Sequence, residues 1–437
     1  MQVDQKTVAT VLHPVDPGSI SGFCSVHERL LCVSSADSSP LTLESLGKLR
    51  RDPNCCGLRN RLLSLDEAVQ ELAHLKGVGG DLILDCTTAG EGRDPQGLVK
   101  IARRTGMLIL MGASVAQIKG TALCNTPECI ESIGRELRGQ LLLGEEVPDP
   151  AAAKVPGSKL ATVRVQAGFI SVALERDSDA GAESTGGCPK EGAAIGIGDL
   201  RDDEVALLRG SAWAQRETGA PLVIAVPPFA GSTPEQALAC FLAGGGDPSK
   251  LILAGMHGGC SQPLDAQREL LRAGATLCFD LFGRTEWLPG PNFFPSDEQV
   301  AARVAELARL GYGAQLLISQ GVMFRTHLTR YGGFGYGHAI LTVPPRLKRL
   351  GMTGGDVSAA LGGNALRLLS WYKPLPPPVV PKEFLVCSWC QGRFEPVDGE
   401  YFHKFDFVYC GVRCLRKHRD DGFKPISDDC AREGGPF

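Results

Sequence analysis

The sequence lacks the features that would mark membrane, secreted or strongly charged proteins. It has no run of about 18 apolar residues, so no transmembrane helix is expected. Its first residues, MQVDQKTVAT, lack the basic-then-apolar pattern of a secretory signal. The formal net charge is only -4, which gives no general attraction to phosphate backbones or acidic membranes. We therefore expect a cytoplasmic or nuclear protein that has no membrane partner.

A complete nucleotide-binding motif is also missing. The glycine-rich segment GIGDL at 196–200 follows an apolar run, but neither a full G-x-G-x-x-G nor a G-K-S/T occurs. What the chain does have is length: 437 residues, 43% of them hydrophobic, can bury one large core and still form a second small unit.

The sixteen cysteines fall into two groups. Those from Cys24 to Cys278 are scattered, and a chain of this size without a visible secretory signal does not depend on disulfides, so we expect reduced structural thiols. The five cysteines near the C-terminus are clustered and predict a different role.

Apolar runs alternate with helical patterns along the first 370 or so residues. Ser64, Thr126 and Ser296 each have the residue type and spacing that open a helix. Eight segments read as strands: 22–30, 81–88, 107–114, 162–174, 221–227, 250–255, 276–283 and 315–321. The pattern predicts an α/β protein with a (β/α)8 TIM barrel over residues 1–372. Functional residues of such a barrel lie at the C-terminal ends of its strands.

Several stretches resemble the phosphotriesterase family of the amidohydrolase superfamily, which includes the phosphotriesterase-related proteins of animals. These stretches are TVLHPVDPGSISGFCSVHERL, DCTTAGEGRDPQGLVKIARRTGMLILMG, AWAQRETGAPLVI, FDLFG and RYGGFGYGHAI. The resemblance implies a hydrolase of a phosphoester, an amide or a lactone, with two zinc-like ions that supply a hydroxide nucleophile.

The resemblance also implies six metal ligands: a His-x-His pair, a bridging carboxylate, two single histidines and an aspartate. His27 matches the first histidine. The positions that match the other ligands hold Arg29, Val172 or Gly196 (depending on which segment forms the fourth strand), Ala225, Gly255 and Gly321. None of these side chains ligates a metal, and a guanidinium cation repels one. We therefore predict a catalytically degenerate pseudo-hydrolase without barrel metals, in which His27 is a catalytic remnant.

A rebuilt metal site is the alternative. His257 lies two residues beyond Gly255, about 6.8 Å farther along a strand, and Glu175 lies three residues beyond Val172. If either residue restores a ligand, the barrel is a metal-dependent hydrolase. Asp280 and the segment from Tyr331 to His338 are interpreted as supporting or loop residues.

A second module follows the barrel. Residues 373–383 are rich in proline and predict a stiff linker, and the module occupies 384–437. Cys387 and Cys390 are separated by two residues, and Cys410 and Cys414 by three, spacings that let two pairs of thiolates bind one structural zinc ion. The segment resembles treble-clef zinc fingers of the FCS or TRASH type. His418 is an alternative ligand, while His403 and Cys430 are interpreted as bystanders.

The module's charges do not favour one class of partner strongly. Arg413, Arg416, Lys417 and Arg419 form a basic strip that could contact nucleic acid. However, residues 384–437 hold 8 Lys and Arg against 9 Asp and Glu, unlike a dedicated nucleic-acid binder. We therefore expect a scaffold or interaction protein with protein partners, and nucleic-acid binding through the finger remains the other reading.

Overall fold

The computed structural model describes residues 6–32, 41–51, 64–115, 123–150, 162–174, 200–227, 233–257, 263–284, 294–373, 384–394, 396 and 401–424. The chain divides into two compact units, Met1–Pro374 and Leu375–Phe437. The predicted proline linker lies almost wholly outside the described residues.

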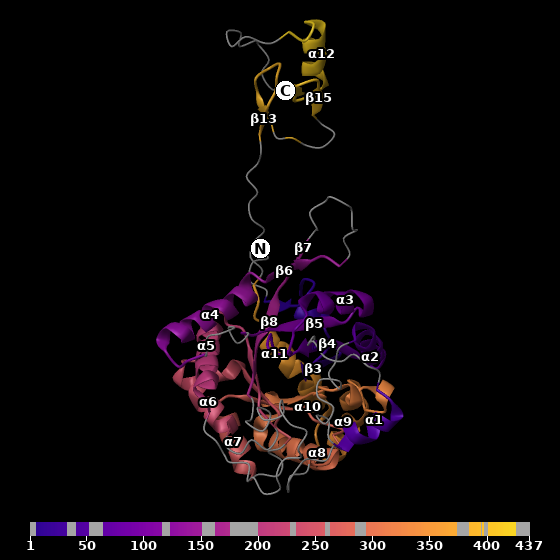
Figure 1. Ribbon diagram of the computed structural model, residues 1–437, viewed down its shortest axis with the longest axis vertical. Helices are drawn as coiled ribbons and strands as arrows, with labels where there is room; N and C mark the ends of the chain where they lie inside the picture. Colours follow the sequence, from indigo (N-terminus) through magenta and orange to yellow (C-terminus); the bar gives the residue numbers. More distant parts are fainter. Residues whose placement is uncertain are drawn as a thin grey trace. The chain divides into compact units, whose positions relative to one another are not determined.

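The first unit is built on one sheet of eight parallel strands (Figure 1). In sheet order the strands are β12 (Leu316–Ile318), β11 (Thr276–Phe279), β10 (Leu251–Ala254), β9 (Leu222–Ala225), β8 (Ala167–Ala173), β5 (Leu108–Ala113), β4 (Gly80–Asp85) and β3 (Phe23–Glu28). The two edges approach each other at their C-terminal ends, where Arg29 N–H donates to Val322 O at 3.1 Å. The sheet is therefore a nearly closed barrel, which confirms the predicted fold and all eight predicted strands.

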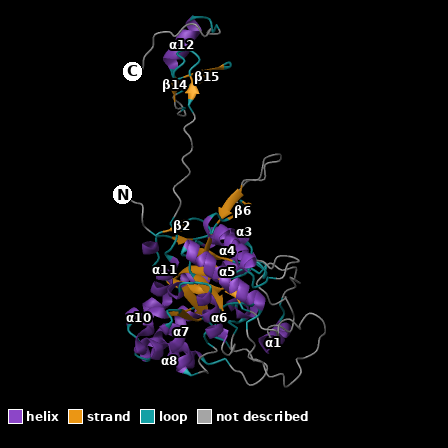
Figure 2. Ribbon diagram, turned by 90° about the vertical axis from the view of Figure 1, so that its left-hand side faces the viewer, coloured by secondary structure: helices purple, strands orange, loops and turns teal. Residues whose placement is uncertain are grey.

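Helices cover the outside of this barrel, as Figure 2 shows with helices in purple around strands in orange. They are α1 (Leu43–Arg51), α2 (Leu65–Gly77), α3 (Pro95–Thr105), α4 (Pro127–Leu142), α5 (Asp202–Thr218), α6 (Thr233–Ala243), α7 (Leu264–Arg272), α8 (Asp297–Leu307), α9 (His338–Arg349), α10 (Gly354–Ser358) and α11 (Asn364–Leu369). The hydroxyls of Ser64, Thr126 and Ser296 accept backbone N–H groups of α2, α4 and α8, which confirms the predicted caps. Helix α1 was not expected, because its segment reads as polar.

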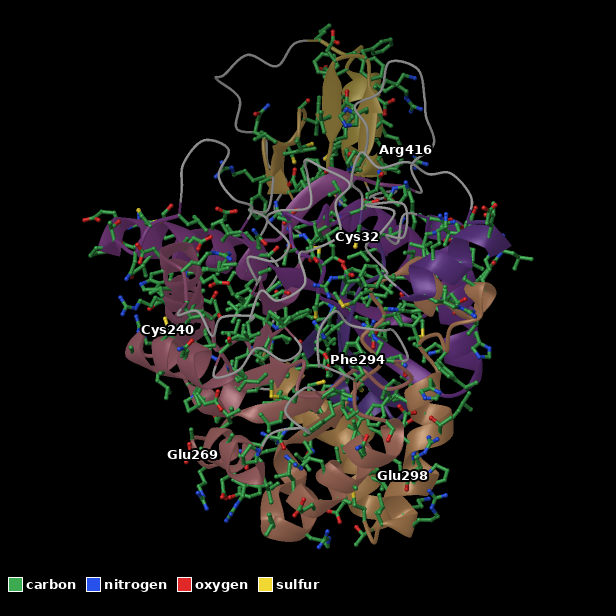
Figure 3. The ribbon with its side chains drawn as sticks, turned by 60° about the horizontal axis from the view of Figure 1, so that its bottom comes forward. Cys32, Cys240, Glu269, Phe294, Glu298 and Arg416 are labelled. Atoms are coloured by element: carbon green, nitrogen blue, oxygen red, sulfur yellow. The ribbon has the colours of Figure 1, made fainter. Side chains whose placement is uncertain are left out.

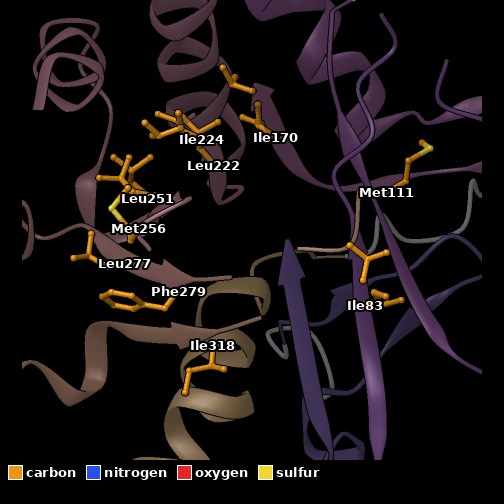
Figure 4. Packing of buried hydrophobic residues seen from close by; sticks show 14 of the residues in the cluster. Ile83, Met111, Ile170, Leu222, Ile224, Leu251, Met256, Leu277, Phe279 and Ile318 are labelled. Atoms are coloured by element: carbon orange, nitrogen blue, oxygen red, sulfur yellow. The ribbon is translucent and has the colours of Figure 1, made fainter. Parts of the chain in front are cut away.

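Side chains of the strands fill two separate apolar clusters. The cluster inside the barrel includes Val26, Leu84 and Phe169, and α11 closes it with Leu368. The larger cluster lies between the sheet and the helices, and Figure 4 shows part of it, including Ile83 and Phe279. This alternation of inner and outer side chains decides which residue at each strand end can reach the barrel centre.

Two short hairpins accompany the barrel: β1 (Val8–Ala9) pairs with β2 (Pro14–Val15), and β6 (Glu145–Pro148) pairs with β7 (Thr162–Val165). Thr7 and Tyr372 form an isolated antiparallel bridge, so the two ends of the described barrel sequence lie side by side.

The second unit contains two hairpins and one helix. Strand β13 (Leu385–Val386) pairs with β14 (Arg393–Phe394), β15 (Phe402–Lys404) pairs with β16 (Phe407–Tyr409), and α12 (Val412–Asp420) follows. Among the described residues of both units, no helix combines the length and the apolar character needed to cross a membrane.

Candidate functional site

His27, near the end of β3, faces the residues that follow β11. The pairing of β3 with β4 is irregular between Ser25 and Glu28. There Ser319 Oγ, just beyond β12, accepts the backbone N–H groups of Val26 and His27, both at 3.1 Å. At this irregular end of β3, the His27 side chain contacts Asp280, which follows β11.

His27 and Asp280 form a buried pair. His27 Nδ1 contacts Asp280 Oδ2, while Asp280 Oδ1 accepts the N–H of Gly255 at 2.9 Å. Burial opposes ionisation of Asp280, but the charge and hydrogen bond of His27 outweigh it and hold the pKa of Asp280 below its usual value. His27 Nε2 is buried and has no hydrogen-bond partner among the described residues. A histidine fixed through one nitrogen with the other open is suited to bind a ligand, a proton or a metal.

Arg29 turns the other way, toward the loop after β4. Its Nε donates to Glu91 Oε1 at 2.9 Å, and only 4% of the Arg29 side chain is exposed. Burial works against the charge of Glu91, but Arg29 more than compensates and lowers the pKa of Glu91. Arg29 Nη1 is buried without a partner among the described residues. The rim therefore carries a buried ion pair in which the charge of Glu91 offsets that of Arg29.

Asp85, at the end of β4, carries a strongly perturbed carboxyl group. Its Oδ1 accepts the N–H of Leu30 at 2.9 Å and the hydroxyl of Thr87 at 2.8 Å, whereas its Oδ2 has no partner among the described residues. Complete burial raises the pKa of Asp85 to about 7, although these bonds and Arg29 act in the opposite direction.

Glu28, between the two predicted site residues, binds the end of β12. Its Oε1 accepts the N–H groups of Gln320 and Gly321 at 2.8 and 3.0 Å, and its Oε2 accepts the N–H of Val322 at 2.6 Å. Burial raises the pKa of Glu28, and these hydrogen bonds oppose that rise. The carboxylate thus joins the two edge strands, a role that sequence reasoning missed because its partners are backbone amides almost 300 residues away.

Two of the positions that the resemblance predicts to match metal ligands have a backbone conformation that accepts only glycine. Gly255 and Gly321 have φ values of +86° and +62°. A Cβ atom would lie 2.1 Å from Val226 O at position 255 and 2.1 Å from Asp280 O at position 321. In this backbone conformation, no side chain fits at either position.

The remaining positions that the resemblance predicts to match metal ligands differ in the direction of their side chains. Val172 on β8 belongs to the cluster between sheet and helices, whereas the hydroxyl of its neighbour Ser171 donates to Cys86 O at 3.0 Å on the inner side. Ser171 rather than Val172 is therefore the inward residue there. Ala225 ends β9 and is partly buried. Gly196 lies outside the described residues, and β8 is the segment that forms the fourth strand of the barrel.

His257 lies near Asp280, and its ring packs against aromatic side chains. Its Nδ1 is 3.9 Å from Asp280 Oδ1, the N–H of Leu281 approaches it at 3.0 Å, and its ring packs edge-on against Phe282 at 4.8 Å between centroids. Burial lowers the pKa of His257 to about 4 despite the opposing charge of Asp280. Glu175, the other residue considered for a rebuilt site, lies outside the described residues.

The segment from Tyr331 to His338 makes supporting contacts. Tyr331 Oη donates to Glu67 Oε1 at 2.5 Å, next to the ion pair between Glu67 and Arg325. His338 Nε2 lies 2.8 Å from Asp297 Oδ2. These contacts hold the loop after β12 against α2 and α8, and no local pattern predicts Glu67 and Arg325 as partners.

In the second unit, the four predicted zinc ligands lie together. The Sγ atoms of Cys387, Cys390, Cys410 and Cys414 all lie within 4.8 Å of one another. Cys410 Sγ is 3.6 Å from Cys414 Sγ and 3.8 Å from Cys390 Sγ. Tetrahedral zinc with bonds of about 2.3 Å requires sulfur atoms about 3.8 Å apart, so the cluster fits one structural zinc ion. Over the part of the chain that the structure describes, no other group of three or more His, Cys, Asp and Glu residues converges in this way.

His418 belongs to the core of the finger. It is fully buried, its Nδ1 lies 2.9 Å from Tyr409 Oη, and its Nε2 lies 2.8 Å from Lys424 O. Both nitrogens therefore have protein partners, which leaves the four cysteines as the ligand set. Arg413, Arg416, Lys417 and Arg419 are all exposed on α12, and His403 is exposed on β15. Cys430 lies outside the described residues.

Both units are similar to known proteins. Residues 178–369 match the model of the Phosphotriesterase family, and residues 382–426 match the Vms1-associating treble clef domain. The N-acetyltaurine hydrolase of Dictyostelium discoideum is 28% identical over 72% of this chain and 75% of its own length. The N-acetyltaurine hydrolase of Rattus norvegicus is 26% identical over 79% of this chain and 93% of its own length.

Solved structures show the same barrel. A resiniferatoxin-binding protein from Rhodobacter sphaeroides superposes with a TM-score of 0.64 at 26% identity, over 83% of this chain and 95% of that one. A phosphotriesterase homology protein from Escherichia coli has a TM-score of 0.55 at 20% identity over 80% of this chain and 99% of that one, which shows a common fold.

Proposed function

We propose that this chain, which carries a phosphotriesterase-family domain and a Vms1-associating treble clef domain, is an interaction protein whose hydrolase-like barrel has lost its two-metal centre. The barrel serves as a scaffold. The treble clef, folded around one structural zinc ion, makes the contact with a protein partner.

The backbone at Gly255 and Gly321 is the observation that supports this proposal most. Replacing a ligand by glycine could in principle be reversed by one substitution. Here, however, each Cβ position is taken by a carbonyl oxygen 2.1 Å away, and φ is positive at both residues. A histidine at 255 or an aspartate at 321 requires the ends of β10 and β12 to move. The backbone at the ends of β10 and β12 therefore leaves no room for a ligating side chain at position 255 or 321.

Arg29 supports the same conclusion. A guanidinium group offers no lone pair, so Arg29 cannot serve as the second ligand of a His-x-His pair. Because Glu91 holds Arg29 in a buried ion pair, moving the guanidinium away would leave a carboxylate buried without its partner.

The surface of the finger supports a protein partner. Phe405 is 72% exposed, Phe384 51% and Val386 48%. These exposed apolar side chains are the candidates for the contact with a partner. The matching family model is named for association with another protein, which agrees with this assignment.

A hydrolysis assay on the full chain tests the loss of activity. N-acetyltaurine, a lactone and a phosphotriester are offered to protein supplied with Zn²⁺, Mn²⁺ or Co²⁺, alongside the matched variant His27→Ala. We expect no turnover that distinguishes the two proteins. Metal-dependent turnover that His27→Ala abolishes would overturn the proposal.

A metal-dependent hydrolase is the second candidate, and the open Nε2 of His27 favours it. Nδ1 bound to a carboxylate is how metal-binding histidines are commonly oriented. The relatives named N-acetyltaurine hydrolase place amides among the substrate classes to test, together with phosphoesters and lactones.

Nucleic-acid binding through α12 is the third candidate, and it rests on the exposed Arg413, Arg416, Lys417 and Arg419. It predicts binding to RNA or DNA that weakens steeply with salt and with the double variant Arg416→Gln, Lys417→Gln. We expect no such binding, because the acidic residues of the finger balance its basic ones.

A further inference from the structure

Two cysteines lie together at the start of α4. Cys124 precedes the helix, Cys129 is in its first turn, and the backbone N–H of Cys124 donates to Cys129 Sγ at 3.5 Å. Thr126, which caps α4, holds this arrangement. Its N–H donates to Cys124 O at 2.8 Å, and its Oγ1 accepts the N–H of Cys129 at 3.4 Å. The chain therefore folds back on itself between the two thiols.

This arrangement is close to that of a disulfide. The Cα atom of Cys124 is bonded to the nitrogen that contacts Cys129 Sγ, at about 1.46 Å, so that sulfur lies within about 5 Å of this Cα atom. Cys124 Sγ is 3.7 Å from Thr126 Oγ1, the same oxygen that caps the helix beside Cys129. The Cα atoms that a disulfide joins are roughly 4.4–6.8 Å apart. Rotation of the Cys124 side chain, with a small shift of the exposed segment before α4, brings the two sulfur atoms together.

The two thiols are also accessible to reagents in solution. Cys124 is exposed and Cys129 is half-buried. Four other cysteines of the barrel are buried, namely Cys24, Cys32, Cys86 and Cys278. Burial raises the pKa of the Cys24 thiol to about 12, which disfavours the thiolate that oxidants attack. The expectation of structural thiols therefore suits these buried cysteines better than it suits Cys124 and Cys129.

Cys240 on α6, which Figure 3 labels, is a half-buried thiol of a different kind. Its Sγ lies 3.8 Å from Val205 O, and burial raises its pKa although Arg209 acts in the opposite direction. These described contacts of Cys240 join it to a carbonyl oxygen and a guanidinium group of α5, not to a second thiol. Cys240 is therefore a matched control for the pair.

We propose that Cys124 and Cys129 form a redox-modification site, at which hydrogen peroxide or another hydroperoxide converts the two thiols into one reversible disulfide. The Cys124 sulfur attacks the peroxide, the O–O bond breaks, and a sulfenic acid and one water form. The Cys129 sulfur then attacks the oxidised sulfur, so that the S–S bond forms and a second water leaves. The two thiols lose two electrons and two protons, and a thiol reductant reverses the reaction.

This inference goes beyond the proposed scaffold role. It uses neither the residues that the resemblance matches to metal ligands nor the cysteines of the finger. Exposed disulfides in a chain that does not depend on disulfides for its fold are usually transient and redox-sensing, which is the role assigned to this pair.

Peptide mass spectrometry on the full chain tests the proposal. Reduced protein is treated with hydrogen peroxide, remaining thiols are blocked with iodoacetamide, and the chain is digested with trypsin without reductant. Both cysteines fall in one tryptic peptide, residues 120–135, so the disulfide form lacks both alkyl groups and two hydrogen atoms. We expect this form to appear at a peroxide concentration at least about tenfold below the one that oxidises Cys240, and to disappear after treatment with dithiothreitol.

Single substitutions distinguish a pair from two independent thiols. Cys129→Ser should abolish the disulfide and leave Cys124 as a sulfenic acid that dimedone traps, and Cys124→Ser should leave Cys129 open to alkylation. Cys240→Ser is the control and should form the disulfide as the wild type does. The proposal is overturned if peptide 120–135 stays fully alkylated when Cys240 is oxidised, or if Cys124 pairs with a cysteine outside this peptide. Equal trapping of the sulfenic acid in wild type and Cys129→Ser would overturn it as well.

Discussion

Replacing Gly255 by alanine should destabilise the barrel far more than replacing Gly351 by alanine. Both glycines have a positive φ, but only Gly255 has a close neighbour at its Cβ position. At Gly255, φ is +86° and a Cβ atom would lie 2.1 Å from Val226 O. At Gly351, which follows α9, φ is +92° and the Cβ position has no atom within 4 Å. The two substitutions thus share the backbone strain and differ in the clash.

The difference between them can be worked from these two terms. Holding alanine at positive φ costs about 1–2 kcal/mol, and this cost applies to both variants. Relieving a contact more than 1 Å too short against a backbone oxygen requires the end of β9 or β10 to shift, which adds about 2–3 kcal/mol for Gly255→Ala alone. We therefore expect a loss of about 3–5 kcal/mol for Gly255→Ala and about 1–2 kcal/mol for Gly351→Ala.

Urea unfolding of the full chain, followed by far-ultraviolet circular dichroism, gives both free energies of unfolding. The slope with urea should stay the same for the two variants, so that their midpoints can be compared directly. Equal losses for Gly255→Ala and Gly351→Ala would show that position 255 has room for a side chain. A histidine ligand could then be accommodated at position 255, contrary to the proposed loss of the metal centre.

Three further outcomes follow from the rim and the finger. Arg29→His should not create metal binding detectable by isothermal titration with Zn²⁺, because the other matching positions still lack ligands; a bound ion would show that those positions are misaligned. The stability of Asp85→Asn relative to the wild type should rise by up to about 3 kcal/mol between pH 5 and pH 8, because Asp85 has a folded-state pKa of about 7 and the wild type therefore loses stability as the pH rises from 5 to 7; a pH-independent difference would contradict this. Chelation of zinc should expose residues 384–424 to limited proteolysis and leave the barrel intact, and cleavage of both units together would show that they unfold as one.

The fold could be predicted because its signals are local and repeated. Each strand is a short apolar run, and the caps at Ser64, Thr126 and Ser296 mark the helices between them. The four-cysteine cluster was predictable for the same reason, since the spacing of each pair fixes which thiolates meet. Helix α1 was missed although LESLGKLRR is rich in good helix formers, because the segment around it was interpreted as one polar stretch.

The candidate site was less accessible to sequence reasoning because it depends on the phase of side chains at strand ends. Whether Val172 or Ser171 faces the barrel centre is decided by where β8 enters the sheet. His27 contacts Asp280 where the pairing of β3 is irregular, and no local sequence pattern predicts this irregularity. Likewise, the positive φ of Gly255 and Gly321 is visible only once neighbouring carbonyl oxygens are in place.

Metal content tests the central claim most directly. Plasma mass spectrometry is applied to the full chain and to a full-length variant in which Cys387, Cys390, Cys410 and Cys414 are all serine, each purified with zinc present. The account predicts one zinc ion per chain in the first protein and none in the second. Two ions that remain in the variant would contradict it and would restore a two-metal hydrolase.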